Sequence, residues 1–166
     1  MKTRKPSKQA FHITIFLCNI RSAQNAGALM RTADAIGIHE VVFGGYTPGP
    51  EDRFGRARRA FIKASLGAEN NVSWRHTKDC ATALKTLQKI GAYLVAVEQS
   101  ARAVDYKEIK LPKRHIVIIL GNEVAGLPKH VLKLADAVAQ IPMQGKKESL
   151  NVSVAAGIVL YRWFDH

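Results

Sequence analysis

The sequence predicts one α/β domain in which a parallel sheet is covered by helices on both faces. Apolar runs of strand length alternate with segments of helical periodicity along the chain. The 166 residues match the size of a single domain. The 47% hydrophobic and 23% charged residues are typical of a globular protein that folds without a disulfide scaffold. Residues 1–10 are expected to form a short basic lead, and residues 11–166 the domain.

The first half of the chain predicts two strands and one helix. Residues 12–18 alternate and then become wholly apolar, as in a buried strand. Asn25 is expected to cap a helix over residues 26–36, which Gly37 ends. A second strand over residues 40–43 precedes a loop over residues 44–50, because three glycines and two prolines there exclude a regular ladder.

The second half continues the alternation of helices and strands. Thr77 is expected to cap a helix over residues 78–90. Continuous apolar runs over residues 93–97 and 116–120 predict two buried strands. Pro128 suits the first turn of a short helix, which a strand over residues 137–141 follows. The last helix, over residues 151–164, is apolar almost all round, which favours a buried or interfacial position.

The charge balance indicates a polyanionic partner. Lys and Arg number 25 against 13 Asp and Glu, a net charge of +12, which favours nucleic acid or an anionic membrane surface. No apolar run approaches the roughly 20 residues of a membrane-spanning helix, and no secretory leader is apparent, so we expect no membrane partner. Cys18 and Cys80 are the two cysteines, which favours reduced thiols and a cytoplasmic protein. The six histidines lack metal-ligand spacing, so no metal site is expected.

Ligand-binding residues are expected in the loops that follow the strands, because open parallel sheets bind ligands at the carboxyl ends of their strands. The loop after residue 18 leads to Asn25, Gly27 and Arg31. Two interpretations are open here: a capped helix that carries a surface arginine, or an arginine that contacts a phosphate.

The loop after residue 120 reads Gly121-Asn122-Glu123-Val-Ala-Gly126. It fits either a turn that closes around a ligand or an ordinary Asx turn before a helix. Neither the P-loop nor the dinucleotide-binding glycine pattern occurs in the sequence.

Three polar side chains gather where the last helix begins, namely Ser149, Asn151 and Ser153. A helix N-terminus offers free N–H groups, and one such side chain suffices to cap it. The other two are therefore available for another role.

A cationic segment over residues 53–63 carries five positive charges and two aromatic rings, Phe54 and Phe61. A solvated charged face is one interpretation, and contact with RNA phosphates and bases is the one that the net charge favours. The candidate RNA-binding residues are Arg53, Arg56, Arg58, Arg59 and Lys63.

The three loops, in this order, resemble the three motifs of the SpoU/TrmH family of RNA ribose methyltransferases, in the SPOUT superfamily. The matching segments are residues 25–33, 120–127 and 141–155, and the resemblance spans about residues 12–163 with no departure at the motif positions. It implies an α/β fold whose C-terminal part forms a deep trefoil knot, which connectivity rules alone disfavour. It also implies methyl transfer from S-adenosylmethionine to a ribose 2′-hydroxyl, by a homodimer with the active site near the subunit interface.

The resemblance assigns residues to the cofactor and to catalysis. The implied cofactor-binding residues are Val97, Leu120, Gly121, Asn122, Gly126, Ile141, Met143, Ser149 and Leu150. The implied catalytic residues are Asn25, Arg31, Glu123, Ser149 and Asn151. The family mechanism gives Arg31 the role of base, but a guanidinium stays charged in nearly every setting. We therefore expect Arg31 to bind the adjacent phosphate and to stabilise negative charge on the reacting oxygen.

The substrate is expected to be tRNA rather than rRNA, because residues 97–100 and the motif spacing look closest to members that act on the D-loop guanosine. No separate RNA-binding domain is expected, so the methyltransferase domain itself has to contact the RNA. One alternative is a non-catalytic RNA-binding or ribosome-associated module, which is expected to lack one of the catalytic residues. Another is a nucleotide-binding domain that acts on a small molecule, for which a net charge of +12 has no use.

Overall fold

The computed structural model describes residues 11–164, so the predicted basic lead lies outside the described residues. Within them, seven strands form one sheet in the order β3-β2-β1-β6-β4-β7-β5. Every neighbouring pair is parallel, which confirms the predicted fold class. The strands are β1 Ile13–Cys18, β2 Glu40–Gly44, β3 Ser73–Thr77, β4 Tyr93–Val97, β5 Val104–Asp105, β6 Ile116–Leu120 and β7 Ala137–Gln140.

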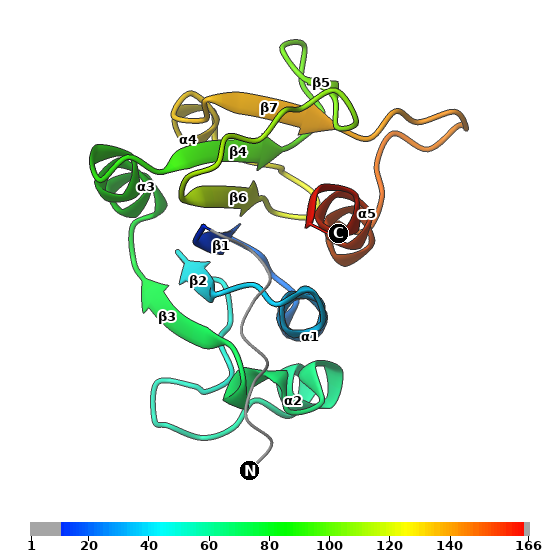
Figure 1. Ribbon diagram of the computed structural model, residues 1–166. Helices are drawn as coiled ribbons and strands as arrows, with labels where there is room; N and C mark the ends of the chain where they lie inside the picture. The colour runs from blue at the N-terminus through cyan, green and yellow to red at the C-terminus, as the bar shows by residue number, and fades with distance from the viewer. Residues whose placement is uncertain (1–10, 165–166) are drawn as a thin grey trace.

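Helices cover both faces of the sheet (Figure 1). Helices α1 (Ala23–Ile36), α2 (Arg59–Ser65) and α5 (Val152–Phe164) lie on one face, and α3 (Cys80–Lys89) and α4 (Lys129–Leu132) on the other. A short 3-10 turn covers Ala68–Asn70. Each face has its own apolar core, and α1 packs against both α2 and α5.

The two central strands explain the long apolar runs in the sequence. All six residues of β1 and all five of β6 are buried, because these strands pack against helices on both sides. Their parallel register places Leu17 beside Leu120, so the two strands end at the same edge. The loops after β1, β4, β6 and β7 therefore start at one edge of the sheet, as the sequence predicts. The knotted path of the C-terminal segment stays a prediction.

Two predicted helix caps are wrong. Helix α1 begins at Ala23, and the Ser22 hydroxyl accepts the N–H of Asn25 at 3.1 Å, so Asn25 lies within the first turn. Helix α3 is capped by Asp79, whose carboxylate accepts the N–H of Thr82. Thr77 cannot cap this helix because it is the last residue of β3.

Besides the short 3-10 turn, one helix and two strands had no counterpart in the sequence prediction: α2, β3 and β5. Strand β3 has the sequence Ser-Trp-Arg-His-Thr and lies at one edge of the sheet, where four of its five residues are exposed. It therefore has no apolar run to reveal it. Helix α2 begins within the cationic segment, and the charged residues Arg59 and Lys63 mask its apolar face. The Phe61 ring on that face is fully buried and meets Phe43 edge-on.

Candidate active site

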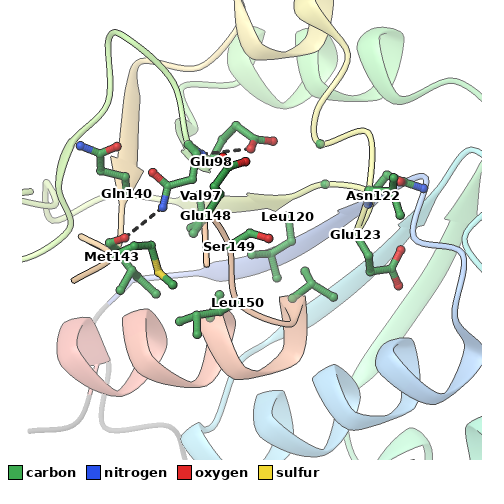
Figure 2. Close-up of a pocket in the computed structure, with 17 residues that line it drawn as sticks. Val97, Glu98, Leu120, Asn122, Glu123, Gln140, Met143, Glu148, Ser149 and Leu150 are labelled. Carbon is green, nitrogen blue, oxygen red and sulfur yellow. Dashed lines mark hydrogen bonds between the residues drawn. The ribbon is translucent and has the colours of Figure 1, made fainter. Parts of the chain in front are cut away.

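A pocket of about 290 Å³ opens at the carboxyl edge of the sheet, close to the lower limit of about 300 Å³ for small-molecule sites. The loops after β4, β6 and β7 and the start of α5 form its walls (Figure 2). All nine residues predicted to contact a cofactor line it. They are Val97, Leu120, Gly121, Asn122, Gly126, Ile141, Met143, Ser149 and Leu150.

The loop after β6 is shaped by a glycine and an Asx turn. A Cβ atom on Gly121 would lie 2.8 Å from the backbone of Gly126 and of Leu127, so a larger residue prevents the loop from closing. The Asn122 side-chain oxygen accepts the N–H groups of Val124 and Ala125 at 2.9 and 2.8 Å. The two interpretations of this segment are therefore compatible, because an Asx turn forms one wall of the pocket.

Glu98 ties this loop to the neighbouring strands, a role that the sequence analysis missed. Its carboxylate accepts the N–H of Leu127 at 2.7 Å and the N–H of Gln99 at 3.0 Å. The Gln99 amide in turn donates to the carbonyl of Ile141 at 2.9 Å. Three loops of the pocket are thus joined by hydrogen bonds. The available signal was the place of Glu98, directly after a buried strand at the ligand-binding edge.

Three predicted catalytic residues meet beside the pocket. The Asn25 amide donates to the Glu123 carboxylate at 2.8 Å, and the Asn151 amide donates to the Asn25 side-chain oxygen at 3.2 Å. The backbone N–H groups of Arg21 and Ser22 also donate to Glu123, at 3.1 and 3.3 Å. Side chains 98 and 126 positions apart thereby form one network, which we call the Asn25–Glu123–Asn151 network.

The network keeps Glu123 ionised. Partial burial raises the pKa of its carboxyl group, but the hydrogen bonds from Asn25 and from the backbone N–H groups of Arg21, Glu123 and Ser22 together outweigh burial. The resulting pKa is lower than the ordinary value. Glu123 is therefore a hydrogen-bond acceptor at neutral pH and not a proton donor.

The other two predicted catalytic residues lie apart from this network. Ser149 is exposed and lines the pocket between Met143 and the loop after β6 (Figure 2). Arg31 is exposed on α1, six residues after Asn25, which turns it by about 120° around the helix axis. Within residues 11–164 its guanidinium forms no hydrogen bond or salt bridge, so it is free to bind a ligand.

The cationic segment exposes one aromatic ring, not two. Phe54 is 65% exposed, and the guanidinium groups of Arg53 and Arg56 lie 4.7 and 5.0 Å from its ring centre. Arg56 also pairs with Asp52 at 2.7 Å. Phe61 is buried in the core, so of the two rings in this segment only Phe54 is available to stack on an RNA base. Arg58 donates to the carbonyl of Glu51, whereas Arg59 and Lys63 are exposed on α2.

Other classes of site find no support in the part of the chain that the structure describes. Residues 11–164 contain no group of three or more His, Cys, Asp or Glu side chains placed to hold a metal ion. No helix among them has both the length and the apolar character needed to cross a membrane. Cys18 and Cys80 are both buried and free.

Comparison with known proteins gives consistent matches. The profile of the SpoU rRNA Methylase family matches residues 12–161. An uncharacterized tRNA/rRNA methyltransferase of Archaeoglobus fulgidus is 35% identical over 89% of this chain and 62% of its own length. The tRNA (guanosine(18)-2′-O)-methyltransferase of Escherichia coli is 34% identical over 90% and 61%. The 23S rRNA (guanosine-2′-O-)-methyltransferase of Coxiella burnetii is 34% identical over 90% and 56%.

Solved structures match over nearly the whole chain. An AdoMet-bound rRNA methyltransferase from Sinorhizobium meliloti superposes with a TM-score of 0.83 at 28% identity, over 95% of this chain and 57% of that one. The A. aeolicus TrmH/SpoU tRNA modifying enzyme gives a TM-score of 0.78 at 27% identity, over 94% and 75%. The chain spans 56–62% of the length of the three curated relatives above.

Proposed function

This chain belongs to the SpoU rRNA methylase family, and from that premise we propose that it transfers a methyl group from S-adenosylmethionine to a ribose 2′-hydroxyl of RNA. The observation that carries the proposal is one juxtaposition. A pocket lined by all nine expected cofactor residues adjoins a network of Asn25, Glu123 and Asn151. A module that has lost catalysis has no need to keep both features.

The chemistry of the pocket fits S-adenosylmethionine. Leu120, Ile141 and Met143 offer apolar surface for the adenine ring and the methionine chain. Glu123 and Glu148 line the same pocket, and carboxylates favour a ligand that carries a sulfonium and an ammonium group. When bound, the cofactor supplies an electrophilic methyl group, and the 2′-oxygen has to approach it in line. Positioning therefore contributes much of the rate.

We assign separate roles in the methyl transfer to the network and to Arg31. We assign the Asn25–Glu123–Asn151 network to orienting the ribose of the target nucleotide beside the pocket. We assign Arg31 to an RNA phosphate next to that ribose, because its guanidinium is exposed and without a protein partner in residues 11–164. The positive charge stabilises the oxygen as its proton leaves to solvent or phosphate.

We further propose a homodimer and an RNA-binding surface on the cationic segment. Val154 and Tyr161 on α5 are 51% and 47% exposed, which supports a contact between copies through this largely apolar helix. Arg59 and Lys63 on α2 are exposed and supply positive charge for RNA phosphates. Light scattering measures the dimer directly, and Tyr161→Glu is expected to yield monomers.

For the substrate we place tRNA before rRNA, on the likeness of residues 97–100 to tRNA-modifying members. Relatives of both kinds match this chain at 34% identity, so the choice needs its own test. The purified protein is incubated with labelled S-adenosylmethionine and separate pools of unmodified tRNA and rRNA. Label in the tRNA pool is expected. Label in rRNA alone reverses the order of substrates, and label in neither pool contradicts the proposed activity.

A further inference from the structure

Tyr46 is an aromatic residue at the candidate active site that none of the roles above uses. It follows the last residues of β2 in the loop over residues 44–50, which leads on to the cationic segment. Its side chain is 61% exposed, although it is a large ring. An exposed aromatic ring beside the pocket offers a face on which the base of an RNA nucleotide can stack.

The hydroxyl end of Tyr46 is fixed to the pocket wall. The Asn122 amide donates to the Tyr46 hydroxyl at 3.0 Å and to the carbonyl of Asn19 at 3.0 Å. Asn122 is 8% exposed, lines the pocket and directly precedes Glu123. The ring is thereby attached to the loop that carries a catalytic residue, while its body stays in solvent.

The backbone of Tyr46 is held as well. Its N–H donates to the Asn19 side-chain oxygen at 3.4 Å. Asn19 has a φ of 59° and Gly45 a φ of 66°, so both residues adopt the left-handed conformation that this close approach requires. Because hydroxyl and backbone are both anchored, little side-chain entropy is lost when a ligand packs on the ring.

The ring itself is uncovered. No aromatic or cationic group from residues 11–164 packs on Tyr46, whereas two guanidinium groups lie over Phe54. Tyr46 therefore offers a free aromatic surface beside the loop that carries Asn122 and Glu123. RNA bases splayed out of a helix stack on rings of this kind, and such stacking tolerates any base.

We propose that Tyr46 is a stacking platform for an RNA base at or next to the methylated nucleotide. This inference rests on the proposed function, because it places the target nucleotide beside the pocket. It names an RNA contact outside the cationic segment, and one that carries no charge.

Three variants test it. Tyr46→Ala removes the ring, Tyr46→Leu keeps apolar bulk without an aromatic face, and Tyr46→Phe keeps the ring but removes the anchored hydroxyl. Each protein is measured for the Kd of S-adenosylmethionine by calorimetry. The Kd of the RNA that the protein methylates, in its unmethylated form, is measured by filter binding over a range of salt concentrations. The KM for RNA is measured in the transfer assay.

We expect the Ala and Leu variants to bind RNA about tenfold more weakly, with an unchanged slope of log K against log salt, since the ring neutralises no phosphate. The RNA Kd of the Phe variant is expected to stay within about threefold of the wild-type value, and all three variants are expected to bind S-adenosylmethionine normally.

Equal losses of RNA affinity in the Phe and Ala variants, together with weaker cofactor binding, overturn the inference. They indicate instead that the Tyr46 hydroxyl supports the Asn122 loop. Unchanged RNA affinity in the Ala variant also overturns it. A wild-type protein that binds no RNA contradicts the proposed function itself.

Discussion

The geometry of the site depends on the carboxylate group of Glu123. It accepts hydrogen bonds from the Asn25 side chain and from two backbone N–H groups at the start of α1. Asn25 in turn accepts from Asn151, which precedes α5. The motif residues could be predicted from their resemblance to a family, but this connection between them could not. A sequence pattern does not reveal which side chains meet when they lie 98 or 126 positions apart.

Removal of the central amide tests the network. Asn25→Ala leaves Glu123 without its side-chain donor, and a hydrogen bond to a charged group contributes about 1.5–3 kcal/mol. We expect kcat to fall by about 10- to 150-fold, while the Kd of S-adenosylmethionine changes less than about threefold. Gln24→Ala, at an exposed position one residue earlier, is the matched control. A parallel loss of cofactor affinity is the result that contradicts a separate network.

The ionised state of Glu123 makes a prediction about pH. Its pKa in the folded protein lies below the ordinary value, so the carboxylate stabilises the fold at pH values above its unfolded pKa of about 4.3. That stabilisation is lost as the pH falls through the folded pKa. We expect wild type to resist urea better than Glu123→Gln at pH 7, and this advantage to shrink below about pH 4. If wild type is more resistant to urea than Glu123→Gln by the same amount at pH 7 and below about pH 4, the result contradicts the assignment of a stabilising, ionised Glu123.

At the scale of elements, the loop after β6 determines whether the pocket exists. Gly121→Ala places a methyl group 2.8 Å from two backbone atoms, so the loop has to open. We expect the affinity for S-adenosylmethionine to fall at least tenfold. Gly145→Ala is the matched control in the loop after β7, because a Cβ atom there meets nothing within 4 Å. If both variants bind the cofactor alike, the shape of this loop is not what forms the pocket.

The elements also explain which parts of the fold the sequence could reveal. Strands β4 and β6 are largely buried on both faces, so their apolar runs predict them directly. Edge strand β3 is exposed, and β5 has two residues, so neither leaves a hydrophobic pattern. Glu98 was missed for a different reason. A single acid after a strand is indistinguishable from a solvated residue until its hydrogen bonds to Gln99 and Leu127 are known.

At the scale of the whole molecule, we expect the net charge of +12 to determine how the affinity for RNA depends on salt. Each phosphate neutralised by Lys or Arg steepens the decrease of affinity with salt by a slope of about 0.9 on duplex nucleic acid. The double variant Arg59→Ala/Lys63→Ala removes two exposed charges of α2, and we expect the slope of log K against log salt to become shallower by about 1 to 2.

The control for this experiment removes the same charge elsewhere. Lys85 and Lys89 are exposed on α3, which covers the opposite face of the sheet. Lys85→Ala/Lys89→Ala is expected to leave the salt slope close to that of wild type. A similar change in both double variants indicates that the whole positive field, and not the cationic segment, attracts the RNA.

The position of the transferred methyl group on the RNA distinguishes ribose methylation from base methylation. RNA labelled by the protein from S-adenosylmethionine is digested with alkali, which cleaves each phosphodiester through the free 2′-hydroxyl beside it. A 2′-O-methyl group blocks that cleavage, so the label is expected in an alkali-resistant dinucleotide. Label released in mononucleotides places the methyl group on a base and contradicts ribose methylation, together with the roles given to Arg31 and to the Asn25–Glu123–Asn151 network.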